Sequence, residues 1–148
     1  MYKSILVATD LLPTSLPALR AGLRVAHEQR ASVGVLYVVE VWMVERQWLT
    51  TITEQDIAFH RAFLMREEEA ALREVNEQIR RVCAEERLEL RVDALVRQGR
   101  AVDRIASAAT ERDCDLIVIG TRARPATLGS VAEQVVRCAG RPVLVVPA

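Results

Sequence analysis

Short apolar runs alternate along the chain with longer segments in which apolar residues recur at helical spacing. Continuous runs rich in β-branched residues are typical of strands buried on both faces of a parallel sheet, and an alternating run is typical of a half-buried strand. Five strands are predicted, at Ile5–Thr9, Val33–Val39, Arg91–Val96, Asp115–Gly120 and Val143–Val146.

Four helices are predicted between these strands. The first begins at Ser15, whose side chain we expect to cap it, carries Pro17 in its first turn and runs to about Glu28. The last two span Ala101–Glu111 and Gly129 to about Cys138.

The second helix, expected within Gln55–Arg87, is long and carries many charged residues. A single apolar stripe marks the face that we expect to pack on the sheet. Its members are Leu72, Val75, Ile79, Val82 and Cys83.

Strands that alternate with helices indicate a doubly wound α/β fold, because each parallel crossover needs a helix and is right-handed. We predict a five-stranded parallel sheet in the order 3-2-1-4-5 with helices on both faces. Ligands of such sheets bind at the carboxyl ends of the strands, where the strand order reverses. Asp10 and Gly120 follow or end strands next to that point, so both are expected to face the crevice.

Composition bounds the class of protein. A chain of 148 residues with 51% hydrophobic content suffices for one domain with a sizeable core. Twenty basic and twenty acidic residues give no net charge, which argues against nucleic acid or an anionic membrane as a partner. Met1 leads directly into a strand without a signal-peptide pattern, and the longest apolar stretch, Val33–Val44, is too short to span a bilayer. A cytoplasmic protein is expected.

The chemistry-bearing side chains form no recognisable catalytic or metal-binding pattern. His27 and His60 fall on different predicted helices, and Ser130 lacks the Gly-x-Ser-x-Gly elbow of a hydrolase. Neither a Gly-x-Gly-x-x-Gly after the first strand nor a Walker lysine motif is present. The cysteines are widely spaced, as expected of buried or idle thiols; they are Cys83, Cys114 and Cys138.

The loop after the fourth strand is the best candidate for a ligand site. Gly120 ends that strand, and Gly129-Ser130 opens the next helix. Glycines let the backbone approach a phosphate closely, and a helix start offers unpaired N–H groups. The pattern therefore favours phosphate at this loop.

Taken together, several segments resemble the universal stress protein family of the UspA type over essentially the whole chain. They are Ile5–Asp10, Leu36–Val39, Val96–Gly99, Asp115–Arg122 and Gly129–Glu133 leading to Arg141–Val146. The resemblance implies a single domain over residues 1–148, a five-stranded parallel sheet and a homodimer formed largely through the fifth strand. Some members of the family bind ATP and others do not.

In the nucleotide-binding members the loop reads glycine, two residues, glycine, nine residues, glycine, then serine or threonine. Gly120, Gly129 and Ser130 match this pattern, but Ala123 replaces the middle glycine and the loop is four residues short. By resemblance Asp10 lies beside the nucleotide, and Val38 and Ile119 line the adenine. The candidate nucleotide-binding residues are Asp10, Val38, Gly99, Ile119, Gly120, Arg122, Arg124, Gly129, Ser130 and Val131.

The substitution at Ala123 weakens phosphate binding without forbidding it, whereas the missing four residues matter more, because they remove part of the arc that would wrap the phosphates. A Cβ at Ala123 costs roughly 1–2 kcal/mol if the position needs a left-handed backbone, and Pro125 removes an N–H donor. Arg122 and Arg124 add two cations that suit phosphate, although exposed arginines are also common on solvated loops.

Other positions leave alternatives open. Asp10 either contacts a ligand or accepts hydrogen bonds from the next turn of backbone, and Gly99 either approaches a ligand or merely ends a strand. The segment with Trp42 and Trp48 either folds back on the sheet or forms a lid or a surface for a partner protein. Val143, Leu144, Val145 and Val146 form an apolar edge strand, which favours pairing with a second copy.

The sequence thus predicts a cytoplasmic homodimer that acts in the stress response by binding rather than as an enzyme. Its degenerate nucleotide site is not expected to bind ATP tightly, and its dimer surface is expected to engage an unidentified protein. The alternative is a switch that binds ATP or AMP with magnesium through Asp10, Gly120 and Gly129-Ser130. No cofactor, metal, nucleic acid or membrane is required, and slow ATP hydrolysis is left open.

Overall fold

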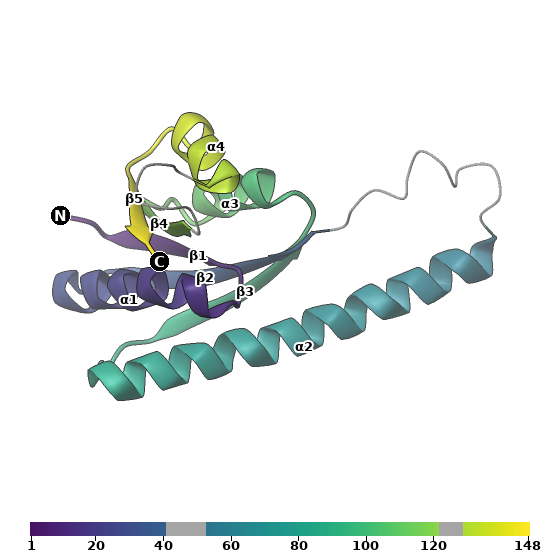
Figure 1. The fold of residues 1–148 in the computed structure, drawn as a ribbon, viewed down its shortest axis with the longest axis horizontal. Coiled ribbons are helices and arrows are strands. Elements are labelled where there is room, and N and C mark those ends of the chain that lie inside the picture. The colour runs from purple at the N-terminus through teal and green to yellow at the C-terminus, as the bar shows by residue number, and fades with distance from the viewer. Residues whose placement is uncertain (41–52, 122–128) are drawn as a thin grey trace.

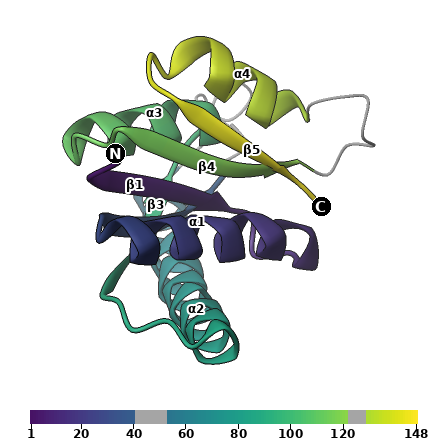
Figure 2. The same ribbon diagram turned by 90° about the vertical axis from the view of Figure 1, so that its left-hand side faces the viewer.

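The chain forms a five-stranded parallel sheet with two helices on each face, in a computed structural model that describes residues 1–40, 53–121 and 129–148 (Figures 1 and 2). The strands are β1 Ser4–Thr9, β2 Ser32–Val39, β3 Val92–Gln98, β4 Leu116–Thr121 and β5 Val143–Pro147. The helices are α1 Leu16–Gln29, α2 Glu54–Glu86, α3 Ala101–Glu111 and α4 Ser130–Cys138, with the short 3₁₀ turn η1 at Pro13–Ser15.

The strand order is β3-β2-β1-β4-β5, which confirms the predicted topology. β1 is central and pairs with both β2 and β4, with Ile5 opposite Val33 on one side and Leu116 on the other. The order reverses between β1 and β4, so the crevice beyond their carboxyl ends is the place where ligands of such sheets bind.

Alternate residues of each central strand point to opposite faces and so build two cores. On one face Val7 and Val118 pack with α1 and α2, and on the other Leu6 and Ile117 pack with α3 and α4. All four side chains are completely buried. Both faces of the sheet are therefore apolar, as the continuous runs predicted.

α1 approaches the sheet most closely at Gly22. A Cβ at this position would overlap with Cγ2 of Val7 and lie 3.5 Å from Cβ of Val118. Val7 and Val118 are fully buried, so neither side chain has free space to move into. The glycine thus sets the distance between α1 and the sheet.

α2 is much longer than the sheet needs. Its C-terminal half packs against the core through Val75, Ile79 and Val82, whereas every residue from 54 to 63 is exposed. Figure 1 shows this N-terminal half extending past the carboxyl ends of the strands. A capping box stabilises its start, because Thr53 Oγ1 accepts from the Asp56 N–H while the Asp56 carboxylate accepts from the Thr53 N–H.

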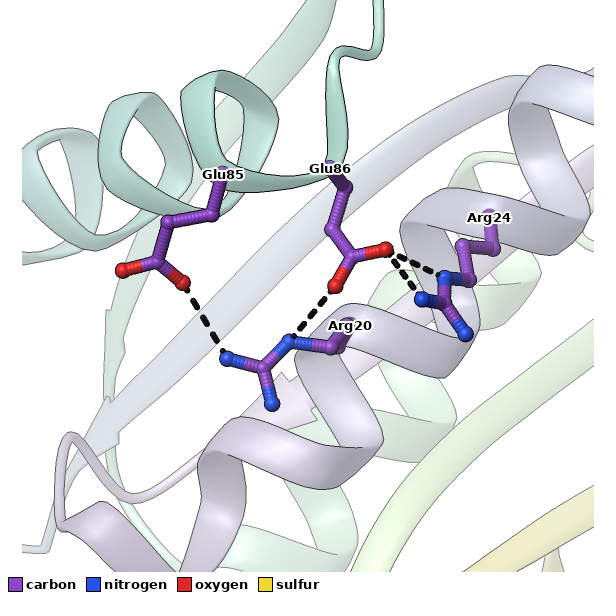
Figure 3. Close-up of polar contacts among 4 residues, drawn as sticks. All are labelled: Arg20, Arg24, Glu85 and Glu86. Carbon is purple, nitrogen blue, oxygen red and sulfur yellow. Dashed lines mark hydrogen bonds and ion pairs between the residues drawn. The ribbon is translucent and has the colours of Figure 1, made fainter.

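Ion pairs fasten the other end of α2 to α1 (Figure 3). Arg20 contacts Glu85 at 3.2 Å and Glu86 at 3.1 Å, and Arg24 Nε donates to Glu86 at 2.6 Å. Glu86 joins both arginines, and its side chain is 16% exposed. Pairs of this partly exposed kind contribute a few tenths to about 1 kcal/mol each, so they fix geometry more than they add stability.

Arg141 ties the start of β5 to the α3–β4 turn. Its Nη1 donates to the carbonyls of Ala109 at 2.8 Å and Cys114 at 2.7 Å, and its Nε donates to Ala139 at 3.2 Å. The carbonyl of Ala109 lies in the last turn of α3 and also accepts the Cys114 N–H at 2.8 Å, so Arg141 adds a second, charged donor to it. This arginine therefore acts as a side-chain cap for α3.

Two details of the sequence prediction were wrong. Leu72 is 40% exposed, and Ala71 is buried instead, because α2 turns a slightly different face to the sheet. Ser15 precedes α1 but does not cap it: its hydroxyl donates to the Leu12 carbonyl and bonds to Thr9, since the chain enters the helix through η1.

The three cysteines, all in described parts of the chain, are free.

Candidate functional site

A cavity of about 770 Å³ lies at the carboxyl ends of β1, β2 and β4. The α4 N-terminus closes one side and the exposed half of α2 borders another, with Phe63 and Glu67 among its lining residues. This volume is within the range of small-molecule sites. The strand-order rule thus located a real cavity.

Most of the sequence-predicted site residues meet there. Asp10, Val38, Ile119 and Gly120 line the cavity from the strand ends. Gly129, Ser130 and Val131 line it from the start of α4. These residues are far apart in sequence, and the parallel topology brings them to one edge of the sheet.

The remaining candidates do not add to this picture. Gly99 is not among the lining residues; its φ is +132° and its N–H donates to the Val39 carbonyl at 3.0 Å, as expected of a glycine that ends a strand. Arg122 and Arg124 lie outside the described residues, as do Ala123 and Pro125. The Trp42 and Trp48 segment also lies outside them.

Asp10 shapes the turn that leads into α1. Its Oδ1 accepts the Leu12 N–H at 2.9 Å, while Thr9 Oγ1 accepts the Leu11 N–H at 3.1 Å. Leu11 has a positive φ of 64°, a conformation that these side-chain contacts help to hold. One carboxylate oxygen of Asp10 is therefore used in the turn, and the same residue lines the cavity.

The start of α4 is built as a site for negative charge. The Gly129 N–H donates to Thr121 Oγ1 at 3.0 Å, which joins the end of β4 to the helix. Gly129 is the N-cap residue and has no side chain with which to cap the following N–H groups of Ser130 and Val131. These groups and the helix dipole face the cavity with partial positive charge.

Gly120 serves packing as well as the cavity. A Cβ added there would lie 3.4 Å from Cβ of Ala18 and 3.7 Å from Cα of Ser15. The end of β4 therefore lies against the first turn of α1. Neither Gly120 nor Gly129 has a left-handed backbone, and a Cβ at either position would make only ordinary contacts.

The opposite wall of the cavity is acidic. Asp10 follows β1, Glu40 follows β2 and Glu67 lies on α2. Burial raises the pKa of the Tyr37 phenol, and the carboxylates of Glu67, Asp10 and Glu40, in that order, raise this pKa further. The phenol hence stays protonated at neutral pH and can donate a hydrogen bond to a ligand.

Sequence reasoning missed the α2 side of the cavity, including His60, Phe63 and Glu67. These residues carry no motif and come from the middle of a charged helix. Glu40 could have been predicted at the cavity, since it directly follows an apolar run and ligands bind at the carboxyl ends of the strands.

Among residues 1–40, 53–121 and 129–148, no group of three or more His, Cys, Asp or Glu side chains is placed to hold a metal ion. Over these same ranges, no helix has the length and apolar character needed to cross a membrane.

Comparisons with known proteins agree on a single family. A family model described as the universal stress protein family matches residues 1–147. A universal stress protein of Methanocaldococcus jannaschii is 31% identical over 150 residues, which cover 99% of this chain and 82% of that protein.

Solved structures with the same fold cover nearly the whole chain. A member of the universal stress protein family from Burkholderia pseudomallei has a TM-score of 0.67 and 26% identity, over 99% of this chain and 97% of that one. A universal stress protein solved in complex with cAMP has a TM-score of 0.65 and 23% identity, over 99% and 97%. One from Archaeoglobus fulgidus in complex with dAMP has a TM-score of 0.62 and 24% identity, over 97% of each chain.

Proposed function

The chain belongs to the universal stress protein family, and on that premise we propose that it acts in the cytoplasmic stress response by binding an adenine mononucleotide, without fast catalysis. The observation that carries this proposal is the cavity of about 770 Å³ between Asp10 and the α4 N-terminus. It joins an anion site to a strand-end crevice lined by Val38 and Ile119, which suits a flat base.

Two kinds of observation support a mononucleotide as the ligand. Structures that share this fold were solved with cAMP and with dAMP. In this chain the loop between Gly120 and Gly129 is short and has Ala123 at the position of the middle glycine, so fewer backbone N–H groups are available to hold a chain of phosphates. We therefore expect one phosphate to be held at α4 and ATP to bind less tightly.

Replacing Gly129 with aspartate is expected to abolish nucleotide binding while keeping the fold. Aspartate is a favourable N-cap residue, so α4 is not weakened, but its carboxylate occupies the place expected for the phosphate. A Cβ at Gly129 would meet Thr121 Oγ1 at 3.5 Å, an ordinary contact, so the substitution fits sterically. Isothermal titration of nucleotide-stripped protein with AMP, and with ATP and magnesium, measures the loss.

The matched control is Gly129→Asn, which has nearly the same shape and capping ability but no charge. We expect it to retain part of the AMP affinity, because its amide can occupy the phosphate position but carries no charge that repels the phosphate, with both variants melting close to the unmodified protein. Heat indistinguishable from dilution for AMP and ATP up to millimolar ligand would refute the nucleotide proposal.

A second candidate function is protein interaction without a nucleotide. Large apolar side chains are exposed on the projecting half of α2, with Phe59 77%, Met65 60% and Phe63 51% exposed. Exposed apolar groups of this size are enriched at interaction surfaces. This candidate becomes the favoured one if the titrations show no binding.

A homodimer through β5 remains part of the proposal. β5 is an edge strand whose residues Val143 and Val145 pack against their own core, whereas Leu144 is 38% exposed. Replacing Leu144 with lysine is expected to shift a β5-paired dimer towards monomer, because the charge would be buried between the copies. Sedimentation at micromolar concentration measures the shift, and a monomeric unmodified protein would contradict the dimer.

A further inference from the structure

The charges around the cavity are unequally distributed. Among the residues that the structure describes, those lining the cavity include three with carboxylates, Asp10, Glu40 and Glu67, and none is a lysine or an arginine. The carboxylates come from the ends of β1 and β2 and from α2, so they gather on the side of the cavity formed by these elements. The partial positive charge of the α4 N-terminus lies across the cavity from α2.

The raised pKa of Tyr37 shows that these carboxylates act on a group in the cavity wall. Its phenol lies in the cavity wall, and after burial the charge of Glu67 is the strongest influence that raises its pKa, ahead of Asp10 and Glu40. Carboxylates close enough to act on one phenol also act on a ligand group placed beside it. Among these three carboxylates Glu67 therefore acts most strongly on the Tyr37 phenol, and it reaches the cavity from α2 rather than from a strand end.

We propose that Glu67, together with Asp10 and Glu40, makes the cavity select a nucleoside monophosphate over the triphosphate. The single phosphate lies at the α4 N-terminus, and the uncharged sugar and base face the acidic wall. There the carboxylates accept hydrogen bonds from ligand hydroxyl or amino groups. This selection rests on the proposed function. It assigns part of the preference for a monophosphate to a residue of α2, Glu67.

The physical basis is repulsion between like charges. A triphosphate carries more negative charge than a monophosphate, so carboxylates that line the same cavity repel it more strongly. Glu67 is exposed, so solvent and salt screen its effect, and the discrimination it provides is limited to roughly threefold to tenfold at low salt. Magnesium bound to the triphosphate neutralises part of the charge and reduces the discrimination.

The test compares the ratio of the ATP and AMP dissociation constants in two variants. Glu67→Gln removes the charge and keeps the shape of the side chain. Glu69→Gln makes the same change two residues away on α2, at an exposed position that does not line the cavity. Titrations without magnesium at low ionic strength are expected to give a ratio about threefold to tenfold lower for Glu67→Gln than for the unmodified protein, and an unchanged ratio for Glu69→Gln.

The outcomes separate the two proposals. If neither nucleotide binds the unmodified protein, the proposed function fails and the selection by Glu67 fails with it. If both nucleotides bind but Glu67→Gln leaves the ratio as Glu69→Gln does, the nucleotide proposal stands and the role of Glu67 is overturned. A loss of fold alone would change both dissociation constants together and leave their ratio unchanged, which also counts against Glu67.

Discussion

Replacing Gly22 with valine is expected to lower the free energy of unfolding by about 3 kcal/mol, the upper end of the usual range for an overpacked core. The new Cβ would overlap with Cγ2 of Val7 and lie 3.5 Å from Cβ of Val118, so little room is left for the two methyl groups of valine. Helix propensity alone predicts a small gain, because glycine is the poorer helix former of the two. The sign of the change in the free energy of unfolding therefore shows whether close packing of α1 or helix propensity dominates at this position. Urea denaturation measures this change.

A double-mutant cycle tests the cause. Val7→Ala alone opens a cavity in the core and is expected to cost about 2 kcal/mol or more. If Val7 is the obstacle, the double variant should be more stable than the sum of the two losses predicts, by about 1 kcal/mol or more. Additive losses would show that Gly22 is constrained by something other than Val7.

Replacing Arg141 with alanine is expected to cost about 3 kcal/mol. The guanidinium donates to the carbonyls of Ala109, Cys114 and Ala139, and hydrogen bonds with a charged donor contribute about 1.5–3 kcal/mol each before relaxation. Water that reaches the partly buried carbonyls recovers some of this loss. Arg141→Lys should lie between, because one ammonium cannot reproduce the fixed fork of an arginine.

The control is another arginine on the same side of the sheet. Arg137 is exposed and pairs with Glu133 one turn away on α4, so Arg137→Ala is expected to cost about 0.5 kcal/mol or less. Chemical denaturation of both variants under one condition gives the comparison. Equal losses for Arg137 and Arg141 would contradict the capping role assigned to Arg141.

The fold could be predicted from the sequence because its signals are local and repeated. Continuous apolar runs mark the buried strands, and α3 spans Ala101–Glu111 as its periodicity predicted. The error at Leu72 has a physical reason: in the part of α2 that packs on the sheet, Ala71 rather than the larger Leu72 faces the sheet. The sequence shows the stripe, but the sheet decides which side of the stripe is buried.

The site was predictable only where it follows from the topology. Asp10 directly follows β1 and Gly120 is the last residue but one of β4, and the carboxyl-end rule places both without knowledge of any contact. Glu67 lies on a helix whose direction across the sheet depends on packing far from it, through residues such as Val82. Arg141 lies in the segment Arg141–Val146, which carries part of the family resemblance. Its hydrogen-bond partners Ala109 and Cys114 are distant in sequence, however, and the periodicity of apolar residues carries no information about such contacts.

The central place of β1 also dictates an order of events during synthesis. β1 can pair with β2 as soon as the first forty residues have emerged, but Leu116, which lies opposite Ile5 in its other neighbour β4, is made more than a hundred residues after Ile5. Until then the innermost strand of the finished sheet has an open, strongly apolar edge. Contacts of such long range slow folding and expose strands to aggregation. We therefore expect the nascent chain to pass through a period in which its central strand is exposed to aggregation.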